Sequence, residues 1–181
     1  PDVINAQEGF FDVESVWPKL EQALRQAISN LVAMRETEGS NIYGDFIKRA
    51  DLIAEKLAVI EERSPQVVEE YQIRLSDRIN ELLAKHNQVI EPERLLQEVA
   101  IFADRTSITE EIVRLKSHIK QFKLIIDADQ PVGRKLDFLI QEFNREANTI
   151  ASKANDYTLA QVVVEIKAEI EKIREQIQNI E

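Results

Sequence analysis

The sequence predicts an all-α protein: a long helical hairpin followed by a helical bundle, with a coiled-coil-like last helix. The 181 residues include only four Gly and five Pro, while Glu, Lys, Leu, Ile and Ala are abundant, a composition typical of helices. Apolar residues recur at three- and four-residue steps, which is the spacing of one helix face. No apolar run approaches the roughly 20 residues of a membrane span, so no membrane segment is expected.

The first half of the chain carries two apolar stripes after an irregular segment. We interpret residues 1–12 as the remnant of a preceding domain or linker, because the chain begins with Pro1 and not Met. Gly39 and Gly44 lie between the stripes and predict a kink or a junction, and Ser64-Pro65 predicts a new helix start. Residues 13–88 are therefore predicted to form the hairpin. The stripes are Leu20, Leu24, Ala27, Leu31 and Met34, then Phe46, Ile53, Leu57 and Ile60.

Residues 89–181 are predicted to form a second helical domain. A helix opens at Glu91-Pro92, a second follows the capping-box pattern at residues 107–110, a third covers residues 133–150, and the last begins at Asn155 or Asp156. The last helix has a heptad seam, which indicates bundle core more often than a zipper, although β-branched Ile would also suit packing between subunits. The seam is Val163, Ile166, Ile170, Ile173, Ile177 and Ile180. The aromatic residues expected in the core are Trp17, Phe122, Phe138 and Phe143.

The charge of the chain is unevenly distributed. No Cys is present, which excludes disulfides and thiolate metal sites and favours a reducing compartment such as the cytoplasm. The formal net charge of −10 argues against indiscriminate nucleic-acid binding. Residues 112–126, however, contain four basic residues and no acid. A phosphate-binding surface needs only such a local basic patch. A solvated basic helix face is the simpler explanation of such a patch.

The helix predicted over residues 133–150 has an unusual polar face. Asn144, Asn148 and Thr149 favour helices less than Ala by up to about 0.7 kcal/mol each. Local preference broken without a visible structural gain points to a site. Glu142 and Glu146 lie one turn apart there, and paired carboxylates suit Mg²⁺ or Mn²⁺, although such pairs also occur on solvated helices without any ion.

A second candidate group lies on the helix that follows the capping box. Glu111, Arg114 and His118 share one face, and a neutral imidazole beside a carboxylate can bind a metal or move protons. A lone histidine is more often structural or exposed, and His86 is expected to be exposed at a helix end. The chain has no phosphate-binding loop and no recognisable Ser/His/Asp arrangement.

Three separated blocks of this sequence resemble the carboxy-terminal region of the bacterial YicC/YloC family, and the likeness extends back to residues 35–39. The family's amino-terminal domain is absent from this chain. The blocks are Ala103-Asp104-Arg105 with Glu110–His118, Gly133–Ile150 with Ser152-Lys153, and Lys172–Glu181.

The resemblance implies a metal-dependent endoribonuclease of the bacterial cytoplasm that uses Mg or Mn, binds RNA and assembles as a hexamer in the full-length protein. Residues 89–181 would be its catalytic-like domain. The implied catalytic residues are His118, Glu142 and Asp137. The implied metal ligands are Glu111, Glu142 and Glu146. The implied RNA-binding residues are Arg114, Arg134, Lys135, Arg145, Asn144 and Asn148, and the basic patch over residues 112–126 adds Lys116 and Lys120 to the predicted RNA-binding set. Two alternatives stay open: a non-catalytic RNA-binding adaptor oligomer in RNA decay, and a purely structural helical bundle.

Overall fold

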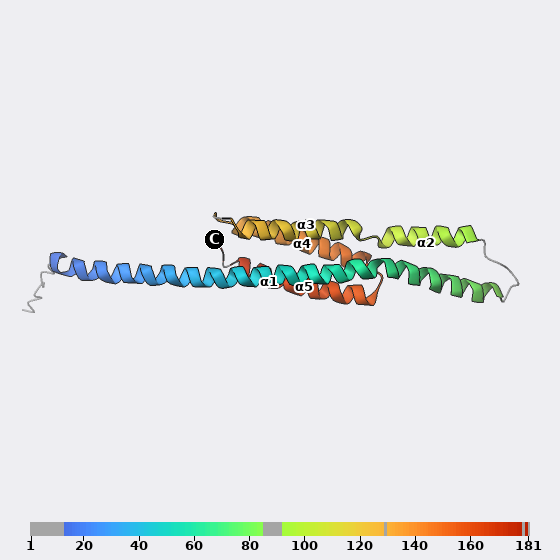
Figure 1. Ribbon diagram of the computed structural model, residues 1–181, viewed down its shortest axis with the longest axis horizontal. Coiled ribbons are helices and arrows are strands. Elements are labelled where there is room, and N and C mark those ends of the chain that lie inside the picture. Colours follow the sequence, from blue (N-terminus) through green and yellow to red (C-terminus); the bar gives the residue numbers. More distant parts are fainter. Residues whose placement is uncertain (1–12, 85–91, 129, 179, 181) are drawn as a thin grey trace, which may run out of the picture. The chain divides into compact units, whose positions relative to one another are not determined.

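The computed structural model describes residues 13–84, 92–128, 130–178 and 180, and every regular element in those ranges is an α-helix (Figure 1). The helices are α1 (Val13–Ala84), α2 (Pro92–Thr106), α3 (Thr109–Ile126), α4 (Gly133–Lys153) and α5 (Tyr157–Ile177). The predicted all-α class is confirmed. No helix in this part of the chain is long and apolar enough to cross a membrane. The expectations for residues 1–12 and for His86 lie outside the described residues.

The chain divides into two compact units, residues 1–43 and 44–181. The division falls inside α1, so the second half of that helix belongs to the same unit as α2–α5. The predicted boundary after residue 88 therefore falls within the second unit.

One continuous helix, α1, occupies the place of the two arms predicted for a hairpin over residues 13–88. Neither predicted break interrupts it. Proline inside a helix costs about 3 kcal/mol or more, but Ile60 and Val67 on either side of Pro65 are both buried and hold the helix against the core. Gly44 costs only about 1 kcal/mol relative to Ala, and Phe46 beside it is buried. Tertiary packing thus overrides the local preference of these residues.

The first unit exposes its apolar stripe. The first half of α1 is the only described element of this unit, so nothing within the unit covers that face. Trp17 is 56% exposed, and the prediction that it belongs to the core is wrong. The stripe residues that are also half or more exposed are Leu20, Leu24, Leu31 and Met34.

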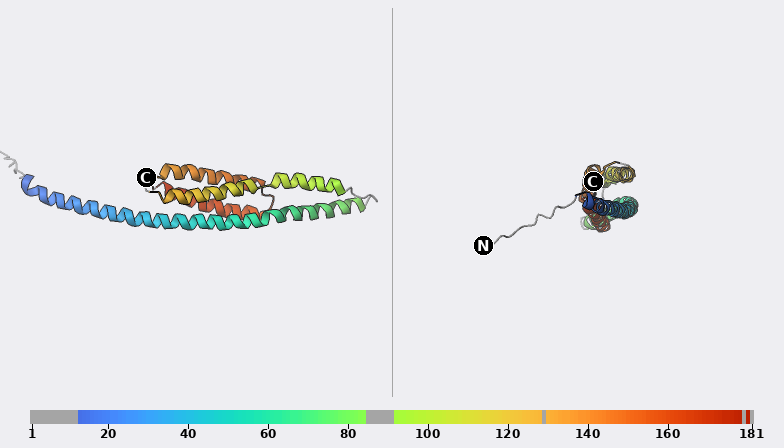
Figure 2. Two further views of the ribbon diagram at one scale, coloured as in Figure 1. Left: turned by 45° about the horizontal axis from the view of Figure 1, so that its top comes forward. Right: turned by 90° about the vertical axis from the view of Figure 1, so that its left-hand side faces the viewer.

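The core of the second unit lies between α3, α4, α5 and the second half of α1. Helix α3 packs on α4 and α4 packs on α5, and the three run side by side in both views (Figure 2). The ring centroids of Phe46 and Phe122 are 5.4 Å apart, and those of Phe122 and Phe143 are 5.9 Å apart. The α5 seam from Val163 to Ile177 is buried in this core. Of the two alternatives, the seam therefore packs within the bundle and not between subunits.

Helices α3 and α5 begin differently: a polar side chain caps α5, whereas the N-cap residue of α3 is apolar. The predicted start of α5 is confirmed, because the Asp156 side chain caps it by accepting a hydrogen bond of 2.9 Å from the Leu159 N–H. Arg63 donates a 2.9 Å hydrogen bond to the same carboxylate, which ties α1 to this end of α5. The capping box predicted at Ser107 is wrong: the N-cap of α3 is Ile108, whose side chain is buried and makes no cap hydrogen bond.

Candidate metal centre

Two antiparallel helices bring a histidine and two glutamates together. His118 lies on α3, and Glu142 and Glu146 lie one turn apart on α4, so both carboxylates project from the same face. One ligand atom from each residue lies within 4.8 Å of the other two. We call these three residues the His–Glu cluster. Metal–ligand distances of about 2.0–2.2 Å place two ligands of one ion up to about 4.4 Å apart, so small side-chain movements would close the cluster around a cation.

The environment of the cluster also fits a cation. Glu146 is only 3% exposed, and a buried carboxylate requires compensation. The Nδ1 atom of His118 is buried without a hydrogen-bond partner, so one ring nitrogen has unused bonding capacity. Phe143, which is fully buried, lies against the imidazole with the ring centroids 6.3 Å apart and the planes inclined by 27°. The ring of His118 is therefore held by the core.

Two arginines approach the carboxylates from the solvent side. Arg114 Nη1 lies 3.8 Å from Glu146 Oε1, and Arg145 Nη1 lies 3.7 Å from Glu142 Oε2. Both distances exceed hydrogen-bond length, and Arg114 instead donates a hydrogen bond to Glu110. The carboxylate oxygens of the cluster therefore keep lone pairs for another ligand, while each guanidinium, at least half exposed, can reach an anion.

Glu111, predicted as a metal ligand, lies outside the cluster. Its buried carboxylate accepts a 2.7 Å hydrogen bond from Lys153, at the far end of α4, and its Oε2 atom has no partner. Burial is the largest influence and acts to raise the pKa of Glu111. The hydrogen bond and charge of Lys153, a backbone hydrogen bond and the charge of Arg114 together outweigh it, so the pKa lies below its ordinary value. Glu111 is thus a charged partner of Lys153.

Asp137, predicted as catalytic, also lies apart from the three clustered residues. Its side chain is exposed and accepts a 3.0 Å hydrogen bond from Gln141, one turn along α4. Asp137 and Gln141 both lie on the solvent-exposed side of α4. Sequence spacing could not separate Asp137 from Glu142, because the register between α3 and α4 decides which α4 carboxylates meet His118.

Grooves beside the His–Glu cluster hold most of the predicted RNA-binding residues. One groove, between α3 and α4, has a volume of about 390 Å³ and contains Arg134 and Lys135 together with His118 and Glu142. We call it the α3–α4 groove. A second, between α4 and α5, has a volume of about 490 Å³. Its lining residues are Gln141, Asn144, Arg145, Asn148, Thr149 and Arg174.

The remaining basic residues predicted to bind RNA lie elsewhere on α3. Lys116 donates a hydrogen bond to Glu61 of α1, and Lys120 is exposed. Lys116 is therefore paired with a carboxylate of another helix at the surface. Sequence reasoning missed Arg174, because α5 was considered only for its apolar seam and the α4–α5 contact was not known.

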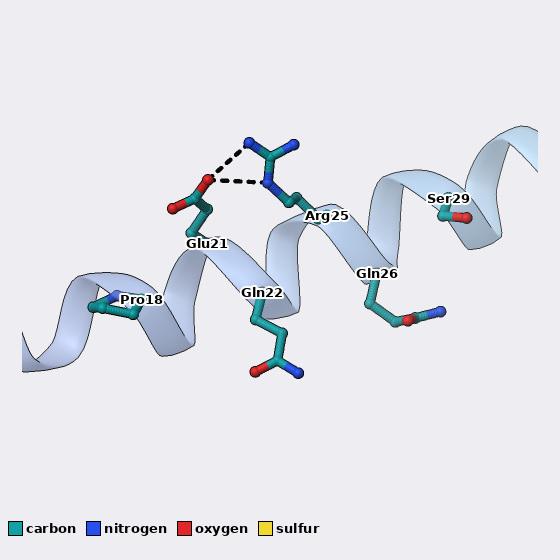
Figure 3. A pocket seen from close by; sticks show the side chains of 6 residues that line it. All are labelled: Pro18, Glu21, Gln22, Arg25, Gln26 and Ser29. Carbon is teal, nitrogen blue, oxygen red and sulfur yellow. Dashed lines mark hydrogen bonds and ion pairs between the residues drawn. The ribbon is translucent and has the colours of Figure 1, made fainter.

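A pocket in the first unit offers no comparable site. Six residues line it, and all come from about three turns of α1 (Figure 3). The only interaction drawn among them is the pair between Arg25 and Glu21, at 2.8 Å, and both side chains point away from the helix. The described residues that line this hollow thus belong to a single helix.

The fold and the cluster define an all-α protein with a candidate divalent-metal centre between two antiparallel helices. The chain belongs to the family described as "Endoribonuclease YicC-like, C-terminal", whose model matches residues 60–181. The resemblance found in the sequence is confirmed.

Two relatives are similar along the whole of this chain. A protein of Clostridioides difficile named "Probable endoribonuclease YicC" is 50% identical over all 181 residues. One of Haemophilus influenzae with the same name is 36% identical over all 181 residues. In both cases the chain spans 61% of the relative's length.

Proposed function

We propose that this chain carries the active region of a metal-dependent endoribonuclease that hydrolyses RNA phosphodiester bonds. Membership of the YicC-like family supports RNA cleavage as the reaction. The observation that carries the metal dependence is the His–Glu cluster, with three ligand atoms within 4.8 Å and an unpartnered, buried imidazole nitrogen.

Within this proposal, His118, Glu142 and Glu146 hold the ion. The donor set of one imidazole and two carboxylates suits Mn²⁺ better than Mg²⁺, because Mg²⁺ prefers oxygen ligands whereas Mn²⁺ also accepts nitrogen. When bound, a divalent ion supplies electrostatic stabilisation of the charge that develops on the phosphate. Since His118 contributes a ligand atom, we assign it to metal binding in preference to the proton transfer considered from the sequence.

The arginines at the rim would position the RNA backbone. Arg114 and Arg145 lie just beyond hydrogen-bond distance of the cluster carboxylates, so a phosphate entering between them would meet guanidinium donors on both sides. The amides of Asn144 and Asn148 in the α4–α5 groove offer further hydrogen bonds to sugar and phosphate oxygens. Glu111 and Asp137 have no part in this arrangement, and each has a partner elsewhere.

Two further parts of the proposal concern the assembly and its location. The exposed apolar stripe on the first half of α1 supports action as part of a larger oligomeric protein, and a hexamer is the state that the family resemblance implies. The absence of Cys supports a cytoplasmic location. Native mass spectrometry of the full-length protein tests the oligomeric state.

The cleavage assay uses labelled RNA with Mn²⁺, Mg²⁺ or EDTA. We expect Glu142→Gln and Glu146→Gln to reduce Mn²⁺-dependent cleavage by more than a hundredfold while circular dichroism stays unchanged. Glu175→Gln is the matched control, because Glu175 is an exposed glutamate on α5 that belongs neither to the cluster nor to either groove. Full cleavage by the folded double variant would overturn the assignment. RNA binding that survives EDTA without any cleavage under any condition would instead support the adaptor alternative.

A further inference from the structure

Phe138 is a large aromatic residue on the surface of α4, next to the His–Glu cluster. It is 65% exposed, so the prediction that it belongs to the core is wrong. Leu136 and Ile140, each two positions away, are both fully buried. Two residues along a helix correspond to a rotation of about 200°, so Phe138 faces away from the core. A single exposed apolar residue is ordinary in itself, and its surroundings decide its meaning.

The surroundings of Phe138 are those of a ligand site. Phe138 lines the α3–α4 groove together with the cationic side chains of Arg134 and Lys135 and with two cluster residues, His118 and Glu142. Ile125 and Leu139 provide the apolar part of the groove, and Gln121 provides a side-chain amide. A flat apolar ring, two cations and an amide in one hollow match the face, the phosphates and the polar edge of a nucleotide.

The order of these groups along α4 matches a nucleotide chain. Arg134, Phe138, Glu142 and Glu146 follow one another at four-residue steps, so they form a row that rises about 6 Å and turns about 40° around the helix per step, from the exposed face toward the buried one. Along α4 the order is therefore a cation, an aromatic ring and then the two carboxylates of the cluster. A base stacked on Phe138 would thus lie one helical turn from the cluster carboxylate of Glu142.

We propose that Phe138 is a stacking platform for an unpaired RNA base, with Arg134 and Lys135 binding the adjoining phosphates. This inference rests on the proposed function, because it takes the cluster as the place of cleavage. In a duplex both faces of a base are already stacked and its polar edge is paired, so only a single strand can present a base to this ring. The two cations in the groove, Arg134 and Lys135, favour a polyanion over an apolar partner helix.

The test compares Phe138→Ala with Phe138→Trp, in the protein with its metal and in a Glu146→Gln background for binding alone. Loss of one stacked base corresponds to roughly a fivefold to hundredfold weaker affinity, and we expect this loss for Phe138→Ala on a single-stranded RNA. Phe138→Trp should bind at least as well as the wild type. Tyr157→Ala is the matched control, because Tyr157 is an aromatic residue that is 83% exposed on α5.

Two further RNA probes separate stacking from a general effect. A strand of the same length without bases should bind the wild type and Phe138→Ala equally, since only the phosphate contacts remain. A fully paired duplex should be cleaved slowly by both. Unchanged affinity of Phe138→Ala for the single strand would overturn the inference. An equal loss with the strand that lacks bases would also overturn it.

The outcomes distinguish this inference from the proposed function. If the wild type cleaves single-stranded RNA and Phe138→Ala cleaves and binds it equally well, the inference fails and the proposed function stands. If the wild type binds without cleaving and Phe138→Ala loses that binding, the proposed function fails and the stacking platform stands. A change of native mass in Phe138→Ala, with RNA affinity unchanged, would assign the ring to a protein contact and overturn the inference.

Discussion

Two buried glutamates, Glu146 and Glu111, should differ in what their neutralisation changes. Neutralising Glu146 should affect cleavage and not stability, whereas neutralising Glu111 should affect stability and not cleavage. Their residue exposures are nearly equal, 3% and 5%, so the desolvation costs are similar. Glu146 lies 3.8 Å from a half-exposed guanidinium, whereas Glu111 lies 2.7 Å from the Lys153 ammonium. At an effective dielectric of 20 these distances correspond to attractions of about 4 and about 6 kcal/mol, and solvent screening at Arg114 lowers the first further.

Desolvation of a buried ion costs several kcal/mol. This cost cancels the attraction between Glu146 and Arg114, whereas the attraction between Glu111 and Lys153 exceeds it. We therefore expect Glu146→Gln to leave the free energy of unfolding unchanged within about 1 kcal/mol and Glu111→Gln to lower it by about 2 kcal/mol. Urea denaturation followed by circular dichroism in EDTA measures both. Only Glu146→Gln should abolish Mn²⁺-dependent cleavage in the full-length protein.

Added Mn²⁺ turns the comparison into a test of the site itself. At a hundredfold excess over the dissociation constant, a ligand that binds only the folded state adds about 2.7 kcal/mol to the free energy of unfolding. The wild type and Glu111→Gln should gain this stabilisation, and Glu146→Gln should not. If Glu146→Gln destabilises the protein in EDTA as much as Glu111→Gln does, Glu146 is a structural residue. Equal stabilisation of all three proteins by Mn²⁺ would refute the placement of the ion.

Three other predictions concern stability and metal preference. Acid should weaken the fold: the hydrogen bond from Arg63 holds the pKa of Asp156 below its ordinary value of 3.8, so its contribution is present above that pH and is lost as the pH falls through the lower folded value. Asp156→Asn should flatten the fall in urea-derived stability between pH 5 and about pH 2, and an unchanged slope would count against the pair. Gly39→Ala and Gly44→Ala should each stabilise the helix by about 0.5–1 kcal/mol in thermal denaturation, because no atom lies within 4 Å of an added Cβ; a loss of stability would contradict this. Mn²⁺ should support faster RNA cleavage than Mg²⁺ at equal concentration, and His118→Asp, which gives an all-oxygen set, should reduce the ratio of the two rates.

Periodicity predicted the helices of the second unit well because the apolar stripes there have partners in the bundle. The buried face of α5 follows the predicted seam, from Val163 to Ile177. Periodicity gave wrong predictions where the continuity of a helix or the burial of a residue depends on packing between elements. Pro65 marks a helix start by local preference, but the buried residues on both sides of it keep α1 continuous. Trp17 belongs to a regular stripe, yet no described element of its unit covers it.

The sequence predicted which types of residue form the candidate site, but not which individual residues lie together in it. Glu142 and Glu146 could be found from their spacing on one helix, because a four-residue step places two side chains on one face whatever surrounds them. Phe138 carried a usable signal, since its angle on the helix wheel opposes that of Leu136 and Ile140. Asp137 could not be set apart from Glu142 by spacing, because both are acidic residues of the same helix and only the contact with α3 distinguishes them.

The register between α3 and α4 decides what each residue on the α3 face does. Glu111, Arg114 and His118 lie on that one face, and the antiparallel α4 presents a different partner to each. Lys153 meets Glu111, Glu146 lies near Arg114, and Glu142 and Glu146 both meet His118. A slip of one turn would separate Lys153 from Glu111 and leave a buried carboxylate unpaired, which costs about 3–5 kcal/mol. The Glu111–Lys153 pair, which takes no part in the proposed chemistry, therefore favours the register that assembles the His–Glu cluster.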